Sequence, residues 1–203
     1  MYAALALILT VSLNACGGSE KTTEESSSPS PTQTVTPTPT LAPEPVRPKG
    51  ATIVKGNGYS FAMPKGWRNL TGKMKASQPA IDVAVGDWRQ HDGFTNNLNV
   101  VVTPTQGAVE DSLGKVARQI KASLTKAAPN YQIRKPTSVA GLPAAHLSGI
   151  YRAGRQRYWL EQYVVIGEQQ TQVISFSVSP DYPRAQRTKL IGDTLASWAT
   201  RIK

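Results

Sequence analysis

The chain has 203 residues and a formal net charge of +10; 39% of the residues are hydrophobic and 18% are charged. Most of the positive charge lies in residues 51–203, where 20 Lys and Arg stand against 9 Asp and Glu, which favours anionic phosphate or carboxylate surfaces as partners. The only cysteine, Cys16, precedes this part of the chain, which excludes thiol catalysis and thiolate metal sites from it.

An uncharged apolar run over residues 3–15 ends at Cys16 and two glycines. As a helix it reaches only about 20 Å, short of a hydrocarbon core of about 30 Å, so it suits a signal peptide better than a membrane span. Its end resembles the lipobox of bacterial lipoproteins, in which the cysteine is acylated. We expect a signal peptide over 1–15 and a lipid anchor at Cys16 on the outer, extracytoplasmic face of the cell membrane. A secreted protein with a free cysteine stays open.

Residues 16–50, which start with Cys16, are rich in Ser, Thr and Pro, as in SSSPSPTQTVTPTPTLAPEP. Such a composition buries too little apolar surface to offset the entropy of ordering the chain, so we expect a disordered tether. Its length allows a folded domain to stand clear of a lipid surface. The Thr-Pro repeats are also compatible with O-linked sugar.

Residues 51–203 have the length of one globular domain, and strand patterns open it. Alternating apolar residues predict strands over 57–63, 80–88 and 97–103, with a turn at residues 64–67. A helix is predicted next, from apolar residues that recur at steps of three and four: Val109, Leu113, Val116, Ile120 and Leu124.

Four strand patterns and a final helix make up the second half. We predict strands over 131–139, 144–151, 157–166 and 171–178. The short turns between the last three require antiparallel neighbours, because a parallel return needs a crossover of about a dozen residues. A closing helix that reaches the C-terminus is predicted from the stripe Ile191, Leu195, Trp198 and Ile202. The expected fold class is α+β, an antiparallel sheet flanked by two helices.

Several segments of this domain resemble a known group of proteins. They are GYSFAMPKGW, the strand NLNVVVTP, the turn-rich AGLPAAHLSG, the pair YWLEQYVVIG and QVISFSVS, and the terminal helix that closes on Trp198. Together with the lipobox and the tether, they resemble the actinobacterial LpqN-type lipoproteins, which are similar in fold to the PsbP/Mog family. The resemblance implies an α-β-α sandwich and an accessory or adaptor role in envelope lipid or wall processes. It assigns no site residue.

The residues that carry chemistry are few. The two histidines, His91 and His146, do not occur in a metal-ligand spacing such as HExxH. Asp87, His91 and Asp92 lie close together around a loop and offer oxygen and imidazole ligands, while His146 beside Ser148 is compatible with a Ser-His-acid arrangement. No GxSxG elbow accompanies any serine. We therefore predict no enzymatic activity, no metal and no cofactor.

The tryptophans divide into two groups. Trp67, Trp159 and Trp198 occupy positions where a buried anchor is expected. Trp88 follows its strand out of phase and precedes Arg89, so we consider it a candidate for stacking on sugar rings or lipid tails. The alternative for Trp88 is a lid on the core.

Three arginines surround a predicted turn. Arg152, Arg155 and Arg157, called the hairpin arginines below, form the densest positive cluster of the domain. Guanidinium groups favour phosphate and carboxylate, so we consider this hairpin end the candidate contact for an anionic partner. The alternative is a solvated turn whose charge prevents edge pairing.

The predicted function is a non-catalytic binding or accessory module of the cell envelope that contacts anionic lipid, wall polymer or a membrane-protein partner. We expect no nucleic acid partner, because an exported lipoprotein rarely meets one. Two alternatives stay open. One is an adaptor or effector that binds a foreign protein through a flat surface. The other is a wall-active hydrolase, which requires titratable side chains to converge in one cleft.

Overall fold

The computed structural model describes residues 44–89, 94–105, 112–153 and 155–200. The expected signal peptide, Cys16 and most of the expected tether lie outside these ranges, as do His91 and Asp92. Within them, no helix combines the length and the apolar character that crossing a bilayer requires.

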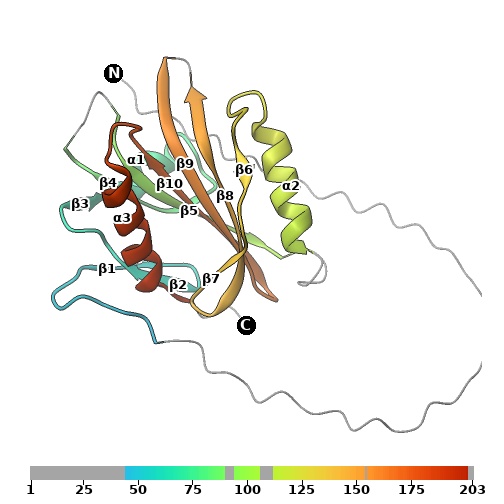
Figure 1. The fold of residues 1–203 in the computed structure, drawn as a ribbon. Helices are drawn as coiled ribbons and strands as arrows, with labels where there is room; N and C mark the ends of the chain where they lie inside the picture. The colour runs from blue at the N-terminus through green and yellow to red at the C-terminus, as the bar shows by residue number, and fades with distance from the viewer. Residues whose placement is uncertain (1–43, 90–93, 106–111, 154, 201–203) are drawn as a thin grey trace, which may run out of the picture.

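A large antiparallel sheet forms the middle layer of the described structure (Figure 1). Its strands are β3 (Trp67–Asn69), β4 (Ile81–Asp87), β5 (Asn97–Pro104), β6 (Gln132–Ile133), β7 (Thr137–Val139), β8 (Leu142–Ala153), β9 (Gln156–Ile166) and β10 (Gln170–Val178). Their order is β3-β4-β5-β10-β9-β8-β6, with β7 paired to β8. The antiparallel pairing of β8 with β9 and of β9 with β10 confirms the prediction from the short turns.

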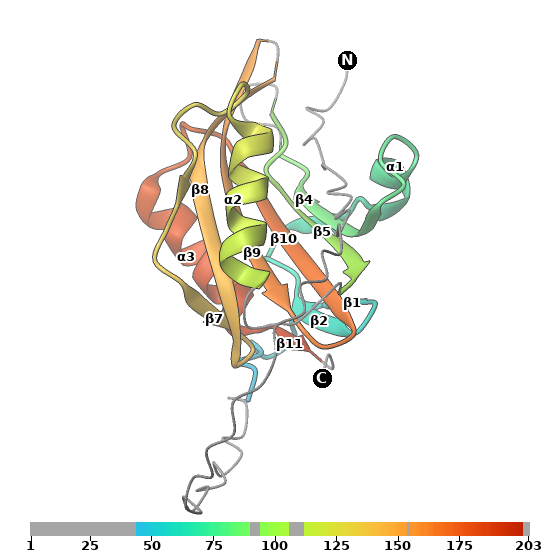
Figure 2. The ribbon, with the colours of Figure 1, turned by 90° about the vertical axis from the view of Figure 1, so that its right-hand side faces the viewer.

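A small sheet and the helices cover the large sheet. The small sheet consists of β1 (Ile53–Gly56), β2 (Tyr59–Ala62) and β11 (Ala199–Thr200), and the helices are α1 (Thr71–Lys75), α2 (Ser112–Leu124) and α3 (Arg184–Ala196). Figure 2 shows α2 on one face of the large sheet and α3 on the other. The fold is therefore α+β with an α-β-α layering, as predicted.

Each face of the large sheet supports a hydrophobic core, because side chains alternate along every strand. On the face that α3 covers, called the α3 face, Ile174 and Phe176 of β10 pack with Ile191 of α3. On the opposite face, Leu160 and Ile120 belong to the core beneath α2. The alternation in the sequence therefore predicted which strand residues are buried together.

The structure corrects the end of the predicted closing helix. Helix α3 ends at Ala196, and Ala199 and Thr200 instead pair with β2. This pairing places Trp198, which is 1% exposed, with its ring centroid 4.9 Å from that of Tyr59 and 4.8 Å from that of Phe61. Burying the Trp198 ring against these two aromatic rings is therefore more favourable than continuing the helix that its spacing predicted.

Other predicted boundaries were also wrong. The expected strand over 131–139 is divided into β6 and β7 around Pro136, which has no N–H for the ladder. The strand β3 begins at Trp67, where only a turn was expected, and β1 and α1 were not predicted. Short elements of two to five residues carry too few apolar positions to show a period.

Candidate functional site

The hairpin of β8 and β9 carries the predicted arginine cluster at its end. Arg152 and Arg157 are direct cross-strand partners, and all three hairpin arginines are exposed. None of the ion pairs found among the described residues includes any of them. Like charges placed opposite each other in a sheet are destabilising, so the hairpin end is an uncompensated positive surface.

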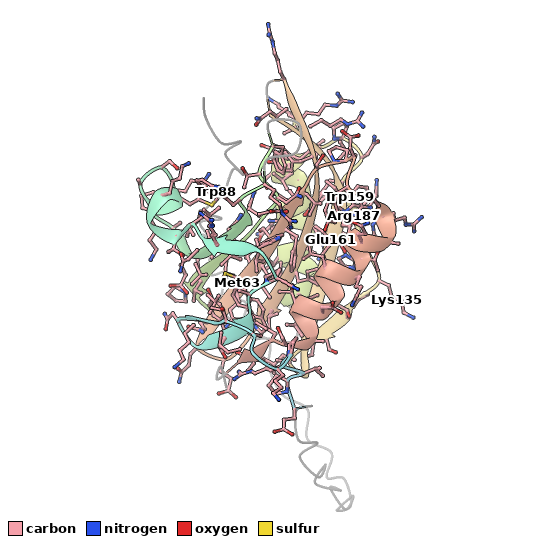
Figure 3. The ribbon with its side chains drawn as sticks, turned by 90° about the vertical axis from the view of Figure 1, so that its left-hand side faces the viewer. Met63, Trp88, Lys135, Trp159, Glu161 and Arg187 are labelled. Carbon is pink, nitrogen blue, oxygen red and sulfur yellow. The ribbon has the colours of Figure 1, made fainter. Side chains whose placement is uncertain are left out.

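Trp159 extends this surface along β9. It lies two residues after Arg157 and therefore on the same face of the sheet. The guanidinium carbon of Arg187, from α3, lies 4.3 Å from the centroid of the Trp159 ring, and Figure 3 shows the two side chains together beside α3. Trp159 was expected to be buried, but it is only half-buried, because α3 places an arginine rather than an apolar side chain over it.

Glu161 holds the next position on this face. Its carboxylate accepts hydrogen bonds from the Trp159 indole N–H at 2.9 Å and the Tyr163 hydroxyl at 2.8 Å, and it pairs with His146 Nε2 at 3.0 Å. The rings of His146 and Tyr163 are stacked, with centroids 4.6 Å apart. These four residues, called the Glu161 network below, fix the orientation of the Trp159 ring.

The electrostatics of this network follow from its burial. Burial raises the pKa of Glu161, but hydrogen bonds from His146, Trp159 and Tyr163 and the charge of His146 together hold it below its ordinary value. Burial lowers the pKa of the Arg187 guanidinium; the Glu161 carboxylate opposes this effect. The site thus combines a well-stabilised carboxylate with a half-buried cation.

Neither histidine-based hypothesis gains support from the described residues. His146 pairs with Glu161, while the Ser148 hydroxyl accepts a hydrogen bond from Arg134 Nε at 2.8 Å. The two side chains that were expected to share a triad therefore have other partners. No group of three potential metal ligands occurs within the described ranges, and the proposed loop site includes two residues outside them.

Trp88 lies apart from the hairpin. It is 60% exposed, so the alternative of a lid on the core is wrong, and the guanidinium carbon of Arg68 lies 4.8 Å from its ring centroid. Figure 3 separates Trp88 from the Trp159 ring. The structure thus does not join the two predicted contacts into one surface.

A pocket of about 290 Å³ lies between the end of β4 and the start of α3. It is lined by Asp87, Arg89, Ser179, Asp181, Tyr182, Pro183 and Gln186. Arg89 Nε donates to Asp87 at 3.2 Å, so this buried carboxylate already has a cationic partner. Asp181, the other carboxylate of the lining, is exposed, so the pocket holds no half-buried unpaired charge like that of Arg187.

Sequence reasoning did not find Arg187 or Glu161. Glu161 had a signal, since it is a carboxylate at the centre of the predicted strand 157–166, whose other residues are mostly apolar or aromatic. Arg187 had none, because only the packing of α3 across β9 brings it to Trp159.

Comparison with known proteins supports the fold rather than an activity. No family model matches the sequence, and no curated protein matches it. Similar solved structures include LpqN of Mycobacterium tuberculosis, described as involved in cell envelope biogenesis, with 14% identity, a TM-score of 0.52, and coverage of 77% of this chain and 89% of LpqN. At this identity the likeness shows a shared fold.

Two further solved structures are more distant in shape. Cyanobacterial PsbP from Synechocystis is 19% identical over 70% of this chain and 86% of its own, with a TM-score of 0.47. A protein of Bacteroides thetaiotaomicron is 12% identical, with a TM-score of 0.47 and coverage of 72% and 46% of the two chains.

Proposed function

We propose that this chain is a non-catalytic accessory module of the cell envelope, held on the outer face of the membrane by a lipid on Cys16. Residues 16–50 serve as its tether, and the folded part contacts an anionic lipid, a wall polymer or a membrane protein. The shared fold with LpqN, a protein described as involved in cell envelope biogenesis, supports this proposal.

The observation that carries the proposal is the uncompensated charge at the hairpin end. Arg152 faces Arg157 directly, and none of the three hairpin arginines takes part in an ion pair within the described structure. Such an arrangement lowers the stability of the free protein, and an anionic partner would relieve it. Arginine, with its planar fork of donors, also suits phosphate and carboxylate better than lysine does.

An exposed tryptophan favours a second candidate, an adaptor that binds another protein. Trp88 is 60% exposed and carries Arg68 against its ring, and Trp and Arg dominate the energetics of many protein interfaces. Trp88→Ala should then abolish capture of a specific protein while leaving lipid binding unchanged. Under the first candidate, lipid binding depends on the hairpin arginines and Trp88→Ala leaves it unchanged.

The anchor is tested on cells that express the chain. We expect the mature N-terminal peptide to begin at Cys16 with the mass of an acylated cysteine, and Cys16→Ser to release the protein from the membrane fraction. An unmodified Cys16 on the mature protein would contradict the anchor.

The contact surface is tested by sedimentation of the Cys16→Ser full chain with vesicles of phosphatidylcholine alone or mixed with phosphatidylglycerol. Replacing all three hairpin arginines by Ala should weaken binding to the anionic vesicles by about 100-fold, because each cation near such a surface contributes about 1 kcal/mol. The matched control removes three exposed lysines elsewhere: Lys55, Lys73 and Lys75. Equal losses in both variants would show that net charge alone matters and would reject the hairpin contact.

A further inference from the structure

We propose that Arg187 forms, together with Arg152 and Arg157, a discrete site for one phosphate group of an anionic phospholipid. This inference rests on the proposed function and deepens it, since it replaces attraction to a charged surface by recognition of a headgroup.

The register of β8 and β9, together with the contact between α3 and Trp159, places the three arginines on one face of the large sheet. Arg152 and Arg157 are direct cross-strand partners, so their Cβ atoms lie about 5 Å apart. Trp159, which follows Arg157 on the same face, starts about 7 Å further along β9, and Arg187 stacks on its ring. Arginine side chains are long enough to meet at one ion across these separations.

Arg187 contributes a guanidinium whose N–H groups donate to no acceptor among the described residues. Among the described residues, no hydrogen bond or ion pair joins its guanidinium to an acceptor, although the group is half-buried. The guanidinium carbon lies over the Trp159 ring, and an indole has no hydrogen-bond acceptor to offer the five N–H donors. Burial also lowers the pKa of Arg187, as expected for a charge that lacks full compensation.

The Glu161 network acts on this cation in two ways: the charge of the carboxylate opposes the lowering of the Arg187 pKa, and its hydrogen bonds orient the ring under the guanidinium. Both oxygens of Glu161 are already used, one by His146 and Tyr163 and the other by the Trp159 indole N–H. Glu161 is therefore a positioning residue: it fixes the orientation of the Trp159 ring, over which the Arg187 guanidinium lies. A site whose cation is held in place before binding loses less entropy when a ligand arrives.

The apolar neighbours of the cluster favour a lipid over a soluble polymer. Ile150 is the direct cross-strand partner of Trp159, and both side chains are half-exposed beside the arginines. Indole rings next to aliphatic and basic side chains are typical of protein surfaces at the headgroup level of a bilayer. A phosphate in that layer presents several oxygens to the guanidinium forks.

The test compares Arg187→Lys, which keeps the charge but loses the fork, with Arg118→Lys at an exposed position on α2, the helix on the opposite face of the large sheet. Both are made in the Cys16→Ser full chain and sedimented with phosphatidylglycerol vesicles. We expect Arg187→Lys to weaken binding about tenfold, the size of one charge-assisted hydrogen bond, and Arg118→Lys to have no effect. Trp159→Phe provides a second variant and should weaken binding in the same direction. Melting curves establish that each variant is folded.

Soluble poly(glycerol phosphate) provides a further arm that separates the outcomes. If Arg187→Lys binds phosphatidylglycerol as wild type does, the discrete site is refuted, whereas loss of binding in the hairpin triple variant would still support the proposed function. Tighter binding to soluble poly(glycerol phosphate) than to vesicles would move the ligand to a wall polymer and overturn the lipid assignment.

Discussion

Replacing Glu161 by Gln removes one negative charge and retains the volume of the side chain. The carbonyl of Gln can still accept from His146 and Tyr163, but its NH₂ group would face the Trp159 indole N–H, donor against donor. The change therefore breaks one hydrogen bond and weakens two others at a side chain that is only 16% exposed.

The size of the effect follows from these contacts. Hydrogen bonds to a charged group contribute about 1.5–3 kcal/mol each, and we expect Glu161→Gln to lower the free energy of unfolding by about 2–3 kcal/mol. For a domain of this size, each kcal/mol shifts the melting temperature by about 2–4 °C, which gives a decrease of about 4–12 °C. Glu168→Gln, at an exposed position, is the control and should leave the melting temperature unchanged.

The effect should depend on pH in one direction. The pKa of Glu161 in the folded protein lies below its ordinary value near 4.5, so its stabilisation is complete above that value and is lost as the pH falls through the folded-state pKa. Thermal melts of wild type and Glu161→Gln at neutral pH should differ, and the difference should shrink as the pH falls below 4.5. Equal melting temperatures of Glu161→Gln and Glu168→Gln at neutral pH would refute the reasoning.

Three other predictions use the same thermal or urea unfolding measurements. Arg152→Gln should raise the melting temperature by about 1–2 °C, because it removes repulsion from Arg157; a decrease would mean that the pair is not strained. Trp198→Ala should cost about 3–5 kcal/mol in urea unfolding, since it empties a fully buried site, and a cost below 1 kcal/mol would contradict the packing. Gly149→Ala should destabilise the protein by about 1–3 kcal/mol, because the added Cβ would lie 2.7 Å from a backbone carbon. Gly192→Ala in α3 should stabilise it by about 0.5–1 kcal/mol, because the added Cβ meets nothing within 4 Å. The opposite order of stabilities would be inconsistent with the geometry.

Local patterns predicted the central strands and their pairing. Ile174, Phe176 and Val178 alternate with polar residues and lie in the core beneath α3, as their spacing indicated. The short turns between β8, β9 and β10 require antiparallel neighbours, and the structure has them. The hairpin arginines could be grouped from sequence for the same reason, since a tight turn brings the residues on its two sides together.

The contacts of the candidate site could not be predicted in this way. Arg187 and Trp159 are 28 positions apart, and no pattern in either segment shows that α3 crosses β9 at this point. Trp198 likewise had a helical spacing, yet it lies beyond α3 and stacks on rings from β2. Such contacts depend on how whole elements pack against one another.

By itself, the sequence determined the fold class, the antiparallel hairpins and the positive hairpin end, because side-chain alternation and turn length act over a few neighbouring residues. Only the tertiary structure decided that a half-buried arginine rests on Trp159 and that Glu161 orients this ring. The physical reason is that burial and cation–π stacking are gained only between surfaces, and the chain brings those surfaces together after its elements have formed.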